Sequence, residues 1–257
     1  MGKYCTMILL TENEQRARSR VCLALDVPTV KIALDLAAEL SDLVGTFKVG
    51  KQLHTAAGNE RINIVQEIYD RGGNAFLDLK FHDTPNTVYE AGRASTVPGV
   101  FIFNIHIGGG EVMCRKALEG AREEAAKKGI ERPKVIGVTV LTSLSDDDLA
   151  VQNFGIGYDE LVLRRTELAE KWGLDGIVCP ANKAGELEKR FGSHLLYVTP
   201  GIAWAGKHGA GQKQLYTPDL AVRDCSNSIL VLGSAITKAD NRKATAREIL
   251  QGMAQYL

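Results

Sequence analysis

The size and composition of the chain indicate one globular domain. It has 257 residues, of which 45% are hydrophobic and 24% charged, and its 31 basic residues balance 31 acidic ones. A chain of this length can bury a full core, so we expect it to fold without a structural metal or a disulfide. The zero net charge argues against nucleic acid as a partner, because binding a phosphate backbone requires an excess of Lys and Arg on one face.

The cysteines and the start of the chain favour a cytoplasmic protein without membrane association. The cysteines are odd in number and scattered, with no C-x-x-C pair: Cys5, Cys22, Cys114, Cys179 and Cys225. Such spacing is typical of reduced thiols. The early apolar run over residues 7–10 is too short for a signal peptide or a membrane span. The first six residues match the loose N-myristoylation pattern, but we interpret about residues 1–18 as a disordered N-terminal extension.

Short apolar runs alternate with amphipathic helical stretches along the rest of the chain. The predicted strands are residues 21–25, 46–49, 75–79, 100–106, 134–140, 176–179, 196–199 and 229–232. The predicted helices include residues 30–40, 61–71, 111–128, 158–172, 183–191 and 239–256. This alternation is typical of βαβ units with a parallel sheet. Because there are about eight repeats, we predict a single (β/α)8 TIM barrel over residues 1–257 rather than an open sheet.

In a (β/α)8 barrel, the active site lies at the C-terminal ends of the strands. Polar residues that close the apolar runs are therefore the candidates for function. They are Asp26, Lys48, Asp78, Lys80, Asn104, His106, Thr142, Ser143, Gly233 and Ser234.

Residues 76–88 form the most informative segment. Side chains alternate along a strand, so we expect Asp78 and Lys80 to point the same way. Carboxylates beside an ammonium group keep it charged and ready to act as an acid. For this pair alone, a simple ion pair at a strand end is the alternative. Adding Lys48 and Asp83 favours an active site, because four alternating charges in one barrel mouth cost desolvation without clear stabilisation.

These residues form part of a longer motif, Asp78-Leu79-Lys80-Phe81-His82-Asp83-Thr84-Pro85-Asn86-Thr87. The motif resembles the signature of the orotidine 5′-monophosphate decarboxylases. Residues 21–26, 47–50, 138–143, 173–179 and 199–202 also resemble segments of that family, and they occur in the family's order. The resemblance covers roughly residues 20–240. It implies a decarboxylase that works as a homodimer on a nucleotide substrate, with no metal and no other cofactor.

The resemblance also implies roles for individual residues. Asp26 and Lys48 would hold the ribose hydroxyls, and Thr142 and Ser143 would contact the pyrimidine or its surroundings. Lys48, Asp78, Lys80 and Asp83 would form an alternating charged tetrad, with Asp83 and Thr87 reaching into the partner subunit's site. Gln212 would help to hold the phosphate. Loss of carbon dioxide leaves a carbanion at C6, which the Lys80 ammonium group would stabilise and then protonate.

Two positions depart from the family's pattern, since Ala203 and Ser234 stand where the family usually has arginine. Arginine holds phosphate with two charged hydrogen bonds, which a serine cannot imitate. As compensation, the turn from Gly233 to Ser234 resembles the phosphate cradle of other barrels. We expect the Gly-rich loop over residues 205–213 to add Gln212 and a lysine, the alternative being a solvated loop.

Other interpretations remain open from the sequence. His82 and His106 have no neighbours at metal-ligand spacing, and we expect Asn104 and His106 to be packed and hydrogen-bonded near the fourth strand. A magnesium-dependent decarboxylase of the 3-keto-L-gulonate 6-phosphate type shares the Asp-x-Lys-x-x-Asp core. A catalytically silent nucleotide-binding barrel is the third candidate, favoured mildly by the two missing arginines.

Overall fold

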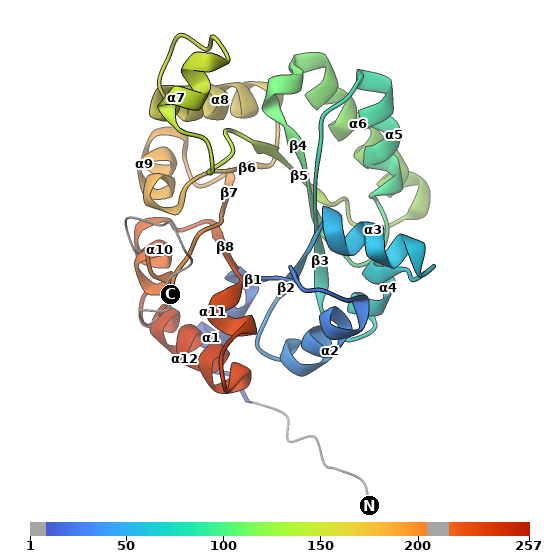
Figure 1. Ribbon diagram of the computed structural model, residues 1–257, viewed down its shortest axis with the longest axis vertical. Coiled ribbons are helices and arrows are strands. Elements are labelled where there is room, and N and C mark those ends of the chain that lie inside the picture. The colour runs from blue at the N-terminus through green and yellow to red at the C-terminus, as the bar shows by residue number, and fades with distance from the viewer. Residues whose placement is uncertain (1–8, 205–215) are drawn as a thin grey trace, which may run out of the picture.

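Eight parallel strands close into a barrel, with helices on its outside (Figure 1). The structure is a computed structural model that describes residues 9–204 and 216–257. The strands follow one another around the barrel in chain order, and β1 also pairs with β8. The strands are β1 Val21–Ala24, β2 Thr46–Gly50, β3 Asn74–Phe81, β4 Val100–His106, β5 Lys134–Val138, β6 Gly176–Val178, β7 Leu196–Thr199 and β8 Ser228–Leu232. The predicted (β/α)8 barrel is confirmed, and β5 ends two residues earlier than we predicted.

The helices agree with the sequence pattern where they are long and amphipathic. Those are α2 Val30–Leu40, α6 Glu111–Lys128, α8 Tyr158–Trp172 and α9 Ala181–Phe191. The remaining helices are α1 Glu12–Arg20, α3 Lys51–Asn59, α4 Ile64–Tyr69, α5 Pro85–Ala94, α7 Asp146–Val151, α10 Pro218–Asp224, α11 Ser234–Thr237 and α12 Arg242–Ala254, with a short 3-10 turn over Ile107–Gly109. The helix predicted over 61–71 is limited to α4. The helix predicted over 239–256 begins at Arg242, because Asn241 caps α12 by accepting a hydrogen bond from the Ala244 amide at 3.0 Å.

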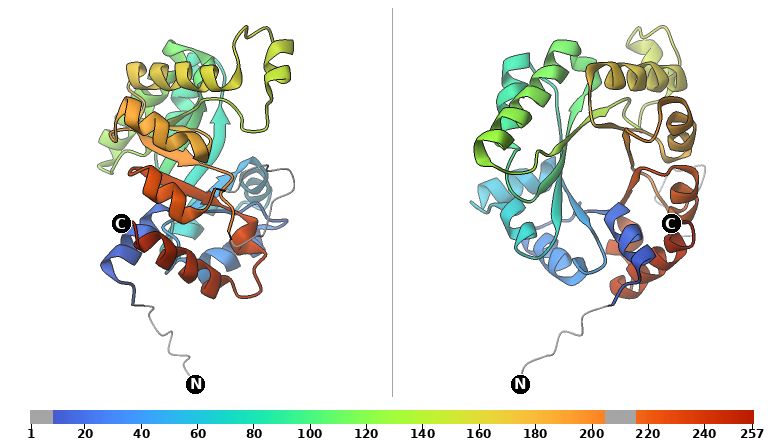
Figure 2. Two further views of the ribbon diagram at one scale, coloured as in Figure 1. Left: turned by 90° about the vertical axis from the view of Figure 1, so that its left-hand side faces the viewer. Right: turned by 180° about the vertical axis from the view of Figure 1, so that it is seen from behind.

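The expected N-terminal extension over about residues 1–18 is too long, because α1 begins at Glu12. Thr11 and Glu14 form a capping box there, in which each side chain accepts a hydrogen bond from the other residue's backbone amide. The helix packs against α12, as the blue and dark red helices show in Figure 2 (right). Ala17 is fully buried in that contact region, so α1 is part of the folded barrel.

The core has two layers, one inside the barrel and one between the strands and the helices. The inner layer is formed by alternate residues of the strands, as expected for a filled barrel. It contains Cys22, Ala24, Phe76, Ile102, Ile136, Leu196, Val198, Ile229 and Val231. This layer closes the barrel below the C-terminal ends of the strands, where the candidate residues lie. Among the helices in the described ranges, none is long and apolar enough to cross a membrane.

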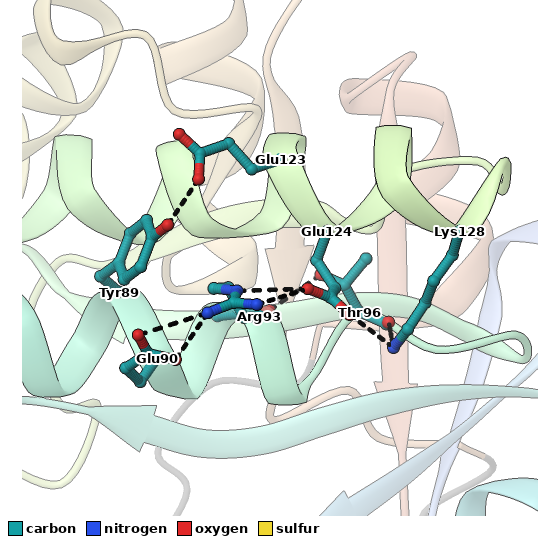
Figure 3. Close-up of polar contacts among 8 residues, drawn as sticks. Tyr89, Glu90, Arg93, Thr96, Glu123, Glu124 and Lys128 are labelled. Carbon is teal, nitrogen blue, oxygen red and sulfur yellow. Dashed lines mark hydrogen bonds and ion pairs between the residues drawn. The ribbon is translucent and has the colours of Figure 1, made fainter.

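Helix α5, which follows the charged segment of β3, is held firmly against α6. Two glycines allow the close approach. A Cβ atom at Gly92 would lie 2.8 Å from the Ala117 carbonyl oxygen, and one at Gly120 would overlap the Tyr89 carbonyl oxygen. Polar contacts line the same seam (Figure 3): Tyr89–Glu123, Arg93–Glu90, Arg93–Glu124, Lys128–Glu124 and Lys128–Thr96. Helix α5 therefore has a fixed position against α6.

Candidate active site

Three of the four predicted tetrad charges meet at the ends of β2 and β3. The Lys80 ammonium group lies 2.5 Å from one carboxylate oxygen of Asp78, and the Lys48 ammonium group lies 3.3 Å from the other. Lys48 also contacts Asp26 at 3.0 Å. The strand ends thus place four charges of alternating sign in one chain, in the order Asp26, Lys48, Asp78 and Lys80.

The backbone at Lys80 is unusual for a strand. Its φ angle is +51°, in the left-handed region, and the pairing of β3 with β4 loses its register between Leu77 and Phe81. A residue with a Cβ atom in this region costs roughly 1–2 kcal/mol. Asp78 and Lys80 therefore meet at an irregularity in the pairing of β3 with β4, and regular alternation, on which the sequence argument relied, does not describe this position.

Asn104 on β4 fills the break in the β3–β4 pairing. Its side-chain oxygen accepts a hydrogen bond from the Lys80 amide at 2.7 Å, and its side-chain nitrogen donates to Asp78 at 2.7 Å. The side chain is fully buried. The packed, hydrogen-bonded role expected for Asn104 agrees with these contacts, but its link to both members of the charged pair could not be read from the sequence.

The surroundings of Asp78 and Lys48 favour the ionised form of both groups. Burial alone would raise the pKa of Asp78, but the charges of Lys48 and Lys80 and the hydrogen bonds from Lys80 and Asn104 hold that pKa below its usual value. Burial alone would lower the pKa of Lys48, but the carboxylates of Asp78 and Asp26 raise it above its usual value. Asp78 and Lys48 are therefore both charged over the whole physiological pH range.

A cavity of about 150 Å³ opens beside these charges. Lys48, Asp78 and Lys80 form one side of it, and Thr142 contributes from the loop after β5. The rest of the wall is apolar and comes mostly from inward-facing strand residues: Phe76, Val138, Val140, Leu141, Val178, Val198, Pro200 and Val231. The sequence analysis did not identify this apolar wall. The alternate residues of β5–β8, which face the barrel interior, could have indicated it. An apolar wall beside fixed charges strengthens their effect on a bound molecule.

Asp83 and Thr87 lie outside this cluster. Both are exposed, in the turn after β3 and in the first part of α5. Among the described residues, the only hydrogen-bond or ion-pair partner of the Asp83 carboxylate is the adjacent Thr84 amide, at 2.6 Å. The Thr87 hydroxyl lies 2.9 Å from the Thr84 hydroxyl. The single chain therefore does not bring Asp83 to the other three members of the predicted tetrad.

The remaining predicted residues are distributed around the barrel mouth. Ser143 is exposed in the loop after β5, next to Thr142, but is not part of the cavity wall. Gly233 and the exposed Ser234 form the turn from β8 into α11. Ala203 is buried, and its amide donates to the Tyr216 carbonyl at 3.1 Å. Gln212 and the expected loop over 205–213, with Lys207 and Lys213, lie outside the described residues.

The His82 and His106 rings lie near the cluster, tilted by 39° against each other, with centroids 5.4 Å apart. Burial lowers the pKa of His106 to about 4, and electrostatic interactions with His82, Lys80, Arg165 and Lys51 add to this effect. His106 is therefore neutral at physiological pH. Within residues 9–204 and 216–257, no three His, Cys, Asp or Glu side chains gather closely enough to hold a metal ion.

Comparison with known proteins shows the family of this chain. Residues 19–249 match the orotidine 5′-phosphate decarboxylase / HUMPS family. The chain belongs to this family. It is 39% identical to orotidine 5′-phosphate decarboxylase of Chromobacterium violaceum, covering 97% of each chain. It is 40% identical to the Moorella thermoacetica enzyme of the same name, over 95% of this chain and 96% of that one.

Solved structures of the family have the same barrel. Orotidine 5′-phosphate decarboxylase from Lactobacillus acidophilus superimposes with a TM-score of 0.78 and 33% identity, over 91% of this chain and 98% of that one. The enzyme from Methanocaldococcus jannaschii, solved with the inhibitor BMP, gives a TM-score of 0.68 at 24% identity, with the same coverage. The latter likeness shows the fold alone. The family resemblance predicted from the sequence is confirmed.

Proposed function

We propose that this chain converts orotidine 5′-monophosphate to uridine 5′-monophosphate and carbon dioxide, as a step of pyrimidine biosynthesis in the cytoplasm. The observation that carries the proposal is the Lys48–Asp78–Lys80 cluster beside an apolar cavity at the barrel mouth. Membership of the family supports the substrate. The described cysteines, all buried and free, are consistent with a reducing compartment.

Lys80 is the central group of the proposed mechanism. The bond between C6 and the carboxylate breaks, carbon dioxide leaves, and the electron pair remains on C6 in the plane of the pyrimidine. The fixed Lys80 ammonium group stabilises this developing negative charge and then transfers its proton to C6. The amine regains a proton from water. Asp78 contacts the Lys80 ammonium group at 2.5 Å and the Lys48 ammonium group at 3.3 Å, and it thereby holds Lys80 beside the cavity. In this proposal, the fixed charge of Lys80 does the work that a metal or another cofactor does elsewhere.

Substrate contacts follow from the positions around the mouth. In the proposal, Asp26 and Lys48 bind the ribose hydroxyls, and Thr142 with Ser143 contacts the pyrimidine or its surroundings. Asp83 and Thr87 enter the active site of a second copy in a homodimer. Their exposure, and the absence of a charged partner for Asp83 among the described residues, support this arrangement.

The substrate phosphate must be bound by other groups, because Ala203 and Ser234 stand where the family usually has arginine. We propose that Gln212, the Gly233–Ser234 turn and a lysine, Lys207 or Lys213, hold it together. The turn has room for a ligand, since the nearest described atom to a Cβ at Gly233 would be the Ala24 Cβ, 3.8 Å away. Each charged hydrogen bond contributes roughly 1.5–3 kcal/mol to binding, so several such contacts would replace one guanidinium group.

Turnover of orotidine 5′-monophosphate, followed by ultraviolet absorbance with EDTA present, tests the proposal. We expect full activity with EDTA and far lower activity with orotidine, which lacks the phosphate. Activity on 3-keto-L-gulonate 6-phosphate that EDTA abolishes would instead identify the magnesium-dependent relative. Binding of the nucleotide without turnover would identify a silent barrel. Equal rates for orotidine and its monophosphate would overturn the phosphate site.

A further inference from the structure

Asn104 connects the two residues that carry the chemistry. It lies 24 positions after Lys80 in the chain, on the neighbouring strand β4, and its two hydrogen bonds end on the Lys80 amide and the Asp78 carboxylate. We propose that Asn104 is a positioning residue that holds the Asp78–Lys80 pair in its reactive geometry. The inference rests on the proposed function and assigns this neutral side chain a part in it.

The first argument comes from the backbone. Between Leu77 and Phe81 the regular ladder of β3 and β4 is interrupted, and Lys80 has a φ angle of +51°. A lysine has no local reason to prefer this conformation, which therefore requires support from its surroundings. The Asn104 oxygen gives that support, because it accepts the Lys80 amide hydrogen that the interrupted ladder leaves without a strand partner. If this bond is lost, Lys80 can relax toward extended backbone, and its ammonium group moves away from the cavity.

The second argument comes from the carboxylate. One Asp78 oxygen receives both the Lys80 ammonium group at 2.5 Å and the Asn104 amide at 2.7 Å. The other oxygen faces Lys48 at 3.3 Å. Asn104 thus limits rotation of the carboxylate and stabilises its charged form, and it does so without adding a charge. The partners also define the orientation of the amide, because a backbone N–H must face its oxygen and a carboxylate must face its nitrogen.

An asparagine at position 104 fits the double task of accepting from the Lys80 amide and donating to the Asp78 carboxylate. A leucine at 104 would leave the Lys80 amide without an acceptor and Asp78 without a donor. An ionised aspartate would accept from Lys80 but repel Asp78. An amide supplies one donor and one acceptor on a short side chain, and its full burial excludes water as a substitute.

Asn104→Ala is the first test, with Ser228→Ala as matched control. Ser228 is also buried on a barrel strand and donates to the Cys225 carbonyl at 3.1 Å, far from the charges. We expect Asn104→Ala to lower kcat roughly ten- to a hundredfold, as a displaced catalytic group does, while KM changes less than about threefold. Ser228→Ala should lower the melting temperature without changing kcat. An Asn104→Ala enzyme with kcat within about threefold of the wild type would overturn the proposal.

The Asn104→Asp variant should give a pH dependence that a merely structural role of Asn104 would not produce. A protonated carboxyl group has the same donor and acceptor as the amide, whereas the ionised form faces Asp78 and loses the donor. The groups around it are Asp78 and Lys80 on β3, Lys48 on β2 and His106 on its own strand. We expect kcat/KM of this variant to fall as pH rises through the pKa of the new carboxyl group, a limb absent from the wild type. A pH profile parallel to that of the wild type would contradict the proposal.

A readout without turnover separates this inference from the proposed function. In protein with 13C-labelled aspartate, the carboxyl signal of Asp78 reports its protonation. Loss of the Asn104 donor should raise the pKa of Asp78 relative to the wild type, and Ser228→Ala should not change it. This result holds whether or not the chain acts on orotidine 5′-monophosphate. An Asp78 titration unchanged in Asn104→Ala would overturn the inference even if the wild type is fully active.

Discussion

At the scale of single residues, the proposed mechanism gives Lys80 two tasks that other enzymes divide between a metal and an acid. Its ammonium group lies against Asp78, beside the apolar cavity, and in the proposal it provides both a fixed positive charge and a proton. Lys80→Ala removes both. We expect kcat to fall by at least about a thousandfold, equivalent to roughly 4 kcal/mol of transition-state stabilisation, with a smaller effect on KM. Steady-state kinetics with orotidine 5′-monophosphate measures this.

An exposed lysine provides the control for that experiment. Lys31 pairs only with Asp35, one helical turn away on α2, among the described residues, and both side chains are exposed. Lys31→Ala should leave kcat and KM unchanged, since a solvated pair of this kind contributes little. A Lys80→Ala enzyme that keeps a tenth of the native kcat would show that another group supplies the proton.

His106 makes a pH-dependent contribution to stability. Its pKa is about 4 in the folded chain, against about 6.5 for an unperturbed histidine, because it is buried near positive groups. As pH falls from about 6.5 toward 4, the unfolded chain binds a proton that the folded chain does not. The unfolding free energy should therefore fall by up to about 1.4 kcal/mol per pH unit in this window.

His106→Asn removes the titrating group, so its stability should vary less with pH than that of the wild type. Denaturant unfolding between pH 7.5 and pH 4.5 measures the difference. The window avoids Asp78, whose pKa is lowered: its stabilising effect is fully present above the unfolded value of about 3.9 and is lost as pH falls further. Parallel curves for variant and wild type would rule out this role of His106.

Sequence pattern identified the charged residues because each one ends an apolar run, as Lys48 and Asp78 do. It could not identify the break at Lys80. The left-handed backbone there depends on Asn104, which comes from another strand, and nothing in the local sequence encodes that contact. Similarly, the apolar wall is formed by single residues from several strands, and only the closed barrel brings them together.

At the scale of elements, the close packing of α5 on α6 fixes the position of α5, which carries Thr87 and begins two residues after Asp83. Gly120 allows this packing, because a Cβ atom there would overlap the Tyr89 carbonyl oxygen. By helix propensity alone, Gly120→Ala would be favourable by about 1 kcal/mol. We expect the reverse, a destabilisation of roughly 1–3 kcal/mol from overpacking, measured by denaturant unfolding.

Gly58 is the matched control, since it lies in α3 and a Cβ atom there meets no other atom within 4 Å. Gly58→Ala should be neutral or stabilising by up to about 1 kcal/mol. If the two variants have the same stability, α5 can move away from α6 at no cost, and the seam does not fix the turn at Asp83.

Elements were predictable where their hydrophobic period extended over many residues, as in α6 and α8. Short helices were missed: α3 has only Leu53 and Ala57 buried, and α10 has only seven residues. Helix α1 was missed although Thr11 and Glu14 at its start form a readable capping box. Its few apolar residues gave no periodic signal, and its place in the fold depends on α12, at the other end of the chain.

At the scale of the whole molecule, the barrel followed from the alternation of strands and helices, but the assembly did not. One chain brings Lys48, Asp78 and Lys80 together and leaves Asp83 exposed on the turn after β3. The proposed homodimer, in which Asp83 and Thr87 enter the neighbouring site, would account for that exposure. The sequence proposed this arrangement only through the family resemblance, because contacts between subunits leave no periodic pattern in a single chain.

Mixing two inactive variants tests the shared site. In a Lys80→Ala and Asp83→Ala hybrid dimer, one site has both native residues and the other has neither. Random exchange of equal amounts should therefore restore about a quarter of the native sites in a two-fold dimer. Turnover before and after exchange, with hybrid formation verified by native mass spectrometry, gives the result.

A second mixture makes the outcome specific. Asp78 and Lys80 come from the same chain and contact each other at 2.5 Å. A hybrid of Asp78→Ala with Lys80→Ala therefore has one of the two residues missing at each site, and no activity should return. Recovery in the first mixture but not in the second places Asp83 in the neighbouring site. If neither mixture recovers although hybrids form, Asp83 serves the site of its own chain, and the turn at its position must close over Lys80 when substrate binds.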